Sequence, residues 1–198
     1  MTSILVLCTG NVCRSPIAEG MLRSLLDGRF GASAPSVASA GMAGWEGSGA
    51  DPRSVEAAAE VGIDISAHRA RHVDVDEVLG ATLVLAMAAE HRDELSRLLP
   101  EAASRTFTLK ELVRLLESLP GDPRDGDPDE VLADRVEEAD ALRPGPGGVP
   151  ATRRDEDVID PLGRRMWTFR AVASDLHAWC GRLVDGLFGV TRAEAEGA

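Results

Sequence analysis

The chain has 198 residues, 44% of them hydrophobic, and a formal net charge of −12 at pH 7. This length suits one domain with a sizeable core, and apolar residues spread along the chain exclude disorder throughout. The acidic balance argues against a nucleic-acid partner, which would require a basic patch. No apolar run reaches the ~18 residues that a membrane span needs, and the run at 4–7 is too short for a signal peptide. We therefore expect a cytoplasmic protein with no membrane partner.

Short apolar runs alternate with helical patterns over the first 119 residues. Runs rich in strand formers indicate strands, and apolar steps of three and four residues indicate helices. At 51–52 an Asp-Pro pair has the pattern of an N-cap followed by proline at N1. The predicted elements, in chain order, are a strand at 3–7, a helix from Pro16, a strand at 36–40, a helix at 51–62, a strand at 82–87, a helix at 89–99, a strand at 105–109 and a helix at 110–119.

Strands that alternate with helices imply an α/β fold, with a parallel sheet covered on both faces. Residues 120–156 interrupt this rhythm with sequences rich in Pro, Gly and Asp. Within this insertion an apolar face over 131–142 predicts a short docked helix on two flexible arms. From Leu162 to Leu187 apolar residues step by four and three without interruption, which predicts a long core helix.

A candidate phosphate site lies between the first strand and the first helix. Cys8 and Arg14 enclose five residues, and Ser15 follows. Such a loop can direct backbone N–H groups at phosphate oxygens while the guanidinium binds two of them. The same dipoles favour the thiolate form of Cys8, and Ser15 can donate to the sulfur. A Cys8 that is merely a small buried residue would leave Gly10 and Asn11 unexplained.

The stretch CTGNVCRSPIAEG at 8–20 resembles the signature of the low-molecular-weight protein-tyrosine-phosphatase family. Matches follow in order at 39–41 (SAG), 66–71 (SAHRAR), 83–87 (LVLAM) and 160–161 (DP), so the resemblance covers nearly everything except about 120–156. It implies one phosphatase domain over 1–198, built as a three-layer sandwich on a four-stranded parallel sheet of flavodoxin-like topology. It also implies hydrolysis through a cysteinyl-phosphate, with no metal or other cofactor.

In this resemblance Asp160 is the general acid, which protonates the leaving group and then activates water. The chain has four Asp-Pro pairs, at Asp51, Asp122, Asp127 and Asp160. The first is explained as a helix cap, and the next two lie in polar loops without an anchor. Asp160 follows an apolar pair and leads into the long helix, so it has rigid support. Asp155 and Asp157 are the alternative acids.

Further roles follow from the family pattern. Asn11 and His68 resemble the pair that braces the phosphate loop. Cys13 matches a second cysteine that can form a reversible disulfide with Cys8, the alternative being a packed thiol. The chain has no tyrosine, so the aromatic wall of the pocket falls to Trp45, unless that residue only anchors its loop. The expected substrate-binding residues are Thr9, Gly10, Asn11, Val12, Cys13, Ser15 and Trp45. The histidines expected on the surface or in packing are His72, His91 and His177.

Three rival functions fit less well. A thiol-coupled arsenate reductase relays a disulfide through further cysteines, but after Cys13 only Cys180 remains, on an apolar helix face. A phosphocysteine carrier needs neither an arginine clamp nor an acid. A catalytically dead phosphate-binding module would not need Cys8, Arg14 and Asp160 together. We therefore expect an enzyme that acts on a phosphorylated protein, with a bacterial tyrosine kinase as one candidate.

The substrate choice lies between phosphotyrosine and phosphoarginine. TFTLKELV and DVIDPLG look like segments of the arginine-phosphatase branch of the family. That branch carries Thr at the position of Val12, where a hydroxyl can orient the guanidinium. With Val12 this hydrogen bond is lost, at a cost of ~1–3 kcal/mol if the group is buried and unpaired. We therefore expect phosphotyrosine to be preferred.

Overall fold

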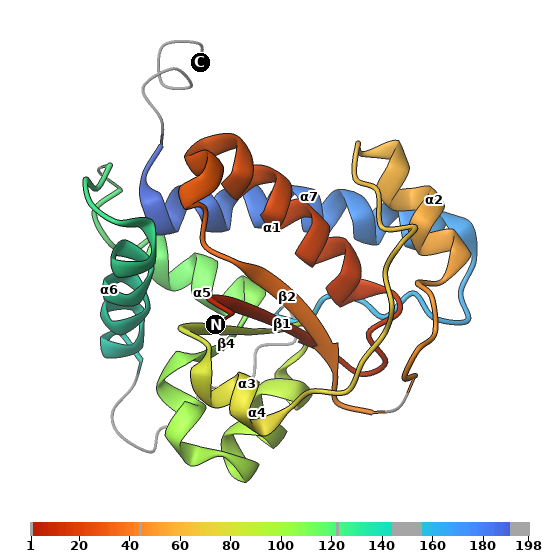
Figure 1. The fold of residues 1–198 in the computed structure, drawn as a ribbon, viewed down its shortest axis with the longest axis horizontal. Helices are drawn as coiled ribbons and strands as arrows, with labels where there is room; N and C mark the ends of the chain where they lie inside the picture. Colours follow the sequence, from red (N-terminus) through yellow and green to blue (C-terminus); the bar gives the residue numbers. More distant parts are fainter. Residues whose placement is uncertain (1, 44, 122, 144–155, 191–198) are drawn as a thin grey trace.

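Four parallel strands form the sheet, in the order β2-β1-β3-β4 (Figure 1). The computed structural model describes residues 2–43, 45–121, 123–143 and 156–190. The strands are β1 (Ile4–Cys8), β2 (Val37–Gly41), β3 (Leu83–Ala86) and β4 (Thr106–Thr108). The predicted strands and the flavodoxin-like topology are confirmed, and every strand end differs from its predicted position by one residue.

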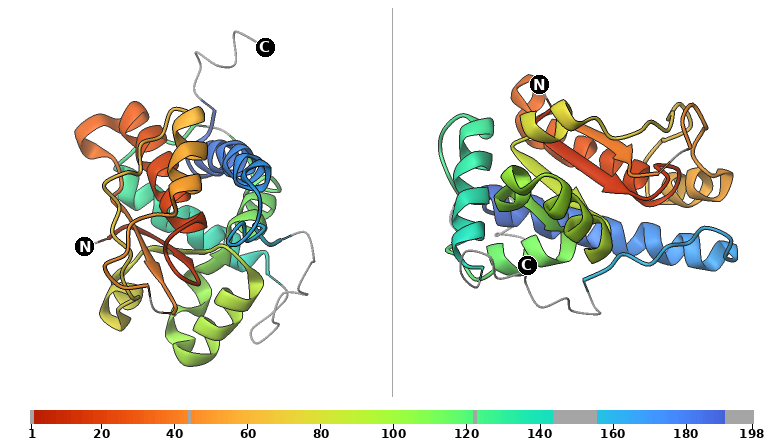
Figure 2. Two further views of the ribbon diagram at one scale, coloured as in Figure 1. Left: turned by 90° about the vertical axis from the view of Figure 1, so that its right-hand side faces the viewer. Right: turned by 90° about the horizontal axis from the view of Figure 1, so that it is seen from below.

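Neighbouring residues of β1 face opposite layers, because side chains alternate along a strand. Ile4 and Val6 pack into one apolar core, and Leu5 and Leu7 into another on the opposite face. Helices cover both faces, which confirms the three-layer arrangement (Figures 1 and 2). The first core is built with α1 (Arg14–Phe30), α2 (Pro52–Glu60), α5 (Leu109–Leu116) and α7 (Met166–Phe188), and the second with α3 (Val75–Gly80), α4 (Ala89–Leu98) and the 3-10 helix η2 (Pro100–Arg105). A short 3-10 turn, η1 (Gly31–Ser33), follows α1.

The starts of two helices follow from local capping. Asp51 accepts a hydrogen bond from the backbone N–H of Arg53 at 2.8 Å, with Pro52 in the first turn, as predicted. At the start of α5 the Thr108 hydroxyl accepts from the Glu111 backbone, and the Glu111 carboxylate accepts from the Thr108 backbone. Such reciprocal bonds satisfy two backbone donors that the helix itself leaves unpaired.

The long helix begins four residues later than predicted. Leu162 is 41% exposed and precedes α7, so its inclusion in the core stripe was wrong. The backbone N–H of Arg164 binds the Pro161 carbonyl at 2.9 Å, and Gly163 has φ +75°. This left-handed turn, which glycine adopts readily, ends the Asp-Pro segment before the helix starts.

The docked helix of the 120–156 segment is α6 (Pro128–Ala141), which lies beside one end of α7 (Figure 2). Its apolar face is buried as predicted except for Leu142, which is 44% exposed. Buried Arg135 donates to the Gly186 carbonyl at 2.6 Å and so ties α6 to α7. Asp127, predicted to lack an anchor, caps α6 through the Asp129 backbone N–H at 2.9 Å. Asp122 and most of the second arm (144–155) lie outside the described residues.

The sequence predicts a protein without a membrane-spanning segment, and the helices of the structure can be compared with that prediction. In the described part of the chain, no helix combines the length and apolarity that crossing a bilayer requires.

Candidate active site

The phosphate-site loop joins the middle of the sheet to α1. β1 ends at Cys8 and α1 begins at Arg14, and β1 lies between β2 and β3. The loop therefore lies beyond the carboxyl ends of the strands, where parallel sheets bind ligands. The free N–H groups of the first turn of α1 add positive potential there.

The Cys8 sulfur is buried and surrounded by donors. It accepts the backbone N–H of Asn11 at 3.2 Å and lies 3.0 Å from the Ser15 hydroxyl. Ser15 Oγ accepts from Asn11 Nδ2 at 2.9 Å, so its own hydrogen is free to point at the sulfur. Donors in this arrangement stabilise a thiolate, the form that acts as a nucleophile.

Asn11 is held in a strained backbone conformation by four hydrogen bonds in addition to the one that its N–H donates to Cys8. Its φ is 53°, the only positive value among described non-glycine residues. Its Nδ2 donates to Ser15 Oγ and to Ser39 Oγ at 2.8 Å, and its Oδ1 accepts from the Arg71 backbone at 3.1 Å. Its carbonyl contacts His68 Nε2 at 2.8 Å. These bonds offset a conformation that costs about 1–2 kcal/mol. Asn11 and His68 are thus together at the loop.

The matched SAG stretch supports the loop in two ways. Ser39 donates to Glu19 Oε2 at 2.6 Å, which leaves its oxygen free to accept from Asn11. A Cβ at Gly41 would lie 2.9 Å from the Thr9 carbonyl oxygen and 3.1 Å from the Asn11 nitrogen. Only glycine lets the end of β2 approach the loop this closely.

Arg14 is 3% exposed and directs its guanidinium toward the loop and the segment before α7. It donates to Thr9 Oγ1 at 3.2 Å, to the Val158 carbonyl at 3.3 Å and to Asp160 Oδ2 at 2.7 Å. Two of the predicted catalytic residues are therefore in direct contact, although 146 positions separate them.

His91, predicted to be a surface or packing residue, is packed in the interior and also contacts the phosphate-site loop. It is 3% exposed, and its Nε2 lies 2.9 Å from Thr9 Oγ1. Burial, with the positive charge of Arg14, lowers the pKa of His91 to about 4. A neutral ring can accept the Thr9 hydrogen while the Thr9 oxygen accepts from Arg14. No motif marked His91, and its position after β3 was the only signal.

The carboxylates of the segment before α7 have distinct partners. Asp160 has a side chain 46% exposed, and its Oδ1 accepts from the Leu162 backbone at 3.0 Å. Asp157 Oδ1 accepts from the Ala89 backbone at 2.7 Å and so caps α4. Of these two, Asp160 is the one in contact with Arg14. Asp155 lies outside the described residues.

The other predicted pocket residues lie on both sides of the loop. Trp45 is 46% exposed, and its indole lies against Gly10, where an added Cβ would approach Nε1 to 2.6 Å. Val12 is 5% exposed and packs in an apolar cluster with Phe169 and Ala173. Trp45 therefore borders the loop from the outside, and Val12 supports it from the protein interior.

Cys13 packs in the same cluster as Val12. Burial raises the pKa of the Cys13 thiol to about 12. Burial also raises the pKa of Cys180, in the core of α7, to about 12. Burial therefore disfavours the nucleophilic thiolate form of Cys13 and Cys180, whereas the hydrogen-bond donors around Cys8 favour it there.

A four-stranded parallel sheet with a thiol and a phosphate-type loop at the end of its first strand defines a cysteine-dependent phosphatase of flavodoxin-like fold. The family model described as low molecular weight phosphotyrosine protein phosphatase matches residues 3–139. The chain belongs to this low-molecular-weight protein-tyrosine-phosphatase family.

Several members of the family are similar to this chain. A probable low-molecular-weight protein-tyrosine-phosphatase, EpsP of Ralstonia solanacearum, is 41% identical over 56% of this chain and 72% of its own. A protein-arginine-phosphatase of Geobacillus stearothermophilus is 38% identical over 93% of this chain and 95% of its own. A low-molecular-weight protein tyrosine phosphatase from T. tengcongensis, a solved structure, has a TM-score of 0.66 and 31% identity, covering 93% of this chain and 99% of the other.

Proposed function

We propose that the chain hydrolyses phosphate monoesters on proteins, most effectively phosphotyrosine, through a cysteinyl-phosphate. The Cys8 thiolate attacks phosphorus, the ester bond breaks, and Asp160 gives its proton to the leaving oxygen. Asp160 then takes a proton from water, which attacks the phosphocysteine, so that phosphate and the Cys8 thiolate are released. Arg14 binds the phosphoryl oxygens in both steps.

One observation supports this proposal above the others: the donor-surrounded Cys8 sulfur lies at one end of the loop that Arg14 closes, and Asp160 contacts the same arginine. The nucleophile and the clamp, from one loop, thus converge with an acid that lies 146 positions from Arg14 in the chain. Neither a phosphocysteine carrier nor a dead binding module needs this convergence.

The hydrolytic role is tested with Cys8→Ser. A serine hydroxyl is a far weaker nucleophile than a thiolate, so we expect hydrolysis of an aryl phosphate to be lost while phosphate binding and the fold are retained. Substantial turnover by the folded variant would overturn the assignment.

The substrate preference rests on Val12 and Trp45. An aromatic ring can pack against the exposed indole of Trp45, whereas Val12 supplies no hydroxyl that could orient a guanidinium. Protein-arginine phosphatase is the second candidate, because the Geobacillus stearothermophilus enzyme of that name is similar over 93% of this chain. Trp45 can also stack on a guanidinium.

Peptides of one sequence carrying phosphotyrosine or phosphoarginine separate these substrates. We expect a higher kcat/KM for phosphotyrosine, and Val12→Thr is expected to shift the ratio toward phosphoarginine by roughly tenfold. A higher kcat/KM for phosphoarginine with the unaltered chain would overturn the substrate choice and leave the phosphatase assignment intact.

The proposed partner is a phosphorylated protein, with a bacterial tyrosine kinase as one candidate. The proposed compartment is the cytoplasm, where a nucleophilic thiol stays reduced. The described cysteines are all free, which suits that environment.

A further inference from the structure

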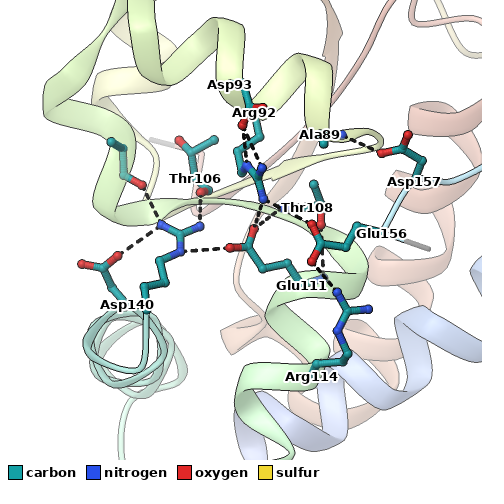
Figure 3. Close-up of polar contacts among 12 residues, drawn as sticks. Ala89, Arg92, Asp93, Thr106, Thr108, Glu111, Arg114, Asp140, Glu156 and Asp157 are labelled. Atoms are coloured by element: carbon teal, nitrogen blue, oxygen red, sulfur yellow. Dashed lines mark hydrogen bonds and ion pairs between the residues drawn. The ribbon is translucent and has the colours of Figure 1, made fainter. Parts of the chain in front are cut away.

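The segment that carries Asp160 is held by hydrogen bonds and ion pairs at the successive residues 156, 157 and 158. Glu156 Oε1 accepts from Arg114 at 2.6 Å, and its Oε2 lies 3.4 Å from Arg92 NH1. Asp157 caps α4, and the Val158 backbone N–H binds the Met87 carbonyl at 2.8 Å. Figure 3 shows Glu156 and Asp157 at the end of this segment, directed toward α4 and α5.

Glu156 is an unusual anchor because it is almost completely buried, with 3% of its surface exposed. Its two arginines come from different helices, Arg92 from α4 and Arg114 from α5. Arg92 is itself 2% exposed and also binds Glu111 at 2.9 Å (Figure 3). Charges are buried in this way only when opposite charges and hydrogen bonds compensate their desolvation. The Glu156 carboxylate therefore fixes its own backbone relative to two helices.

Asp160 needs such a fixed backbone. Its side chain is 46% exposed, so packing does not orient it. Glu156 lies only four residues earlier, and four residues of chain span at most ~14 Å. A general acid works within hydrogen-bond reach of the proton acceptor, and displacement by ~1 Å can cost up to about a hundredfold in rate.

We propose that Glu156, held by Arg92 and Arg114, is a positioning residue that places Asp160 for proton transfer to the leaving group. The inference rests on the proposed function, in which Asp160 is the general acid. Glu156 touches neither the phosphate loop nor Arg14 in the contacts of the described residues, so it acts through the segment 156–160.

Glu156→Gln is the test, because glutamine keeps the shape and removes the charge. Phosphoryl transfer to Cys8 needs the proton with phenyl phosphate but not with p-nitrophenyl phosphate. We therefore expect kcat/KM, which reports this first step, to fall about tenfold for phenyl phosphate and less than about twofold for p-nitrophenyl phosphate. Inhibition by inorganic phosphate should be unchanged, because the loop is intact. Glu117→Gln is the matched control. Glu117 follows the last residue of α5 and forms a solvent-exposed ion pair with Arg182, whose Nε lies 2.8 Å from Glu117 Oε1. Removing this charge should change neither rate.

A second variant and a second background make the result decisive. Arg114→Gln removes the positive partner of Glu156, at a side chain that is 25% exposed. It should likewise lower the rate on phenyl phosphate more than the rate on p-nitrophenyl phosphate. In an Asp160→Asn background, Glu156→Gln should add nothing further. Equal losses on both substrates, no loss on either, or a full additional loss in the Asp160→Asn background would each overturn the positioning role.

Asp160→Asn alone separates this inference from the function on which it rests. If that variant does not lose more rate on phenyl phosphate than on p-nitrophenyl phosphate, the acid assignment fails and the inference fails with it. If it does and the Glu156 and Arg114 variants do not, only the positioning role fails.

Discussion

Arg14 and Asp160 bind each other directly, with the guanidinium nitrogen NH2 2.7 Å from the carboxylate oxygen Oδ2. The same guanidinium is the proposed clamp for the phosphoryl oxygens. A bound phosphate and the Asp160 carboxylate therefore compete for one cation, and they repel each other as like charges. The acid must turn from the clamp toward the leaving oxygen during each turnover.

This competition gives Asp160→Asn two opposite effects. We expect kcat/KM, which reports phosphoryl transfer to Cys8, to fall by about a hundredfold or more for phenyl phosphate and much less for p-nitrophenyl phosphate, because only the former needs the proton in that step. Inorganic phosphate should inhibit the variant several-fold more strongly, because the competing charge is gone. Steady-state kinetics with both substrates measure both effects. Asp157→Asn is the comparison, and a larger loss from that variant would move the acid role to Asp157.

Asn11→Ala should destabilise the protein and abolish most activity. The change removes the Asn11 side-chain hydrogen bonds to Ser15, Ser39 and the Arg71 backbone N–H and keeps a β-carbon in a left-handed conformation. We expect a loss of about 2–4 kcal/mol in the free energy of unfolding, measured in urea. Asn11→Gly should lose about 1 kcal/mol less, since glycine adopts this φ freely. Equal stability of the alanine variant and the parent would show that the loop does not depend on this bracing.

Peroxide should inactivate the enzyme reversibly through a Cys8–Cys13 disulfide. Peroxide oxidises Cys8 to a sulfenic acid, which condenses with the Cys13 thiol and releases water. A reductant should restore activity. In the Cys13→Ala variant the Cys8 sulfenic acid has no partner thiol, so Cys8 should oxidise further to the irreversible sulfinic and sulfonic acids. Peptide mass spectrometry identifies the bridge. Finding Cys180 in it, or recovery of the Cys13→Ala variant equal to the parent, would refute this protection.

The raised pKa of Cys13 predicts selective alkylation. Iodoacetamide reacts with thiolates, and a pKa of about 12 leaves almost no thiolate on Cys13 or Cys180 near neutral pH. Cys8 should be modified first, and inorganic phosphate should slow its modification. Peptide mapping of the folded protein measures this order, and urea-denatured protein, in which all three thiols should react, is the control. Fast labelling of Cys13 in the folded state would contradict its burial.

Much of the fold was predictable because it depends on local patterns. The short apolar runs, the Asp51-Pro52 cap and the Cys8-to-Ser15 spacing each lie within a few residues of sequence, and the strands formed within one residue of where they were expected. The short helix α3 (Val75–Gly80) was not predicted. The start of α7 was missed because Gly163 adopts a left-handed turn that periodicity does not reveal.

The site was less predictable where it depends on pairing across the chain. His91 lies 82 residues from Thr9, and no motif marks it as a site residue; its position after β3 is the only local signal. Glu156 and Arg92 are 64 positions apart, and either alone reads as a solvated surface charge. They are buried only because the fold brings them together, and this is not visible in local composition.

The contact between Trp45 and Gly10 gives the phosphate loop an optical reporter of its own. Indole emission responds to the polarity and charge of its surroundings, and Trp45 touches the loop that an anion would occupy. Trp179 donates to Asp175 at 3.0 Å on α7, and Trp167 is 66% exposed at the start of that helix. Replacing these two with phenylalanine would leave one fluorophore at the loop, so that occupancy and turnover can be followed in real time without a label.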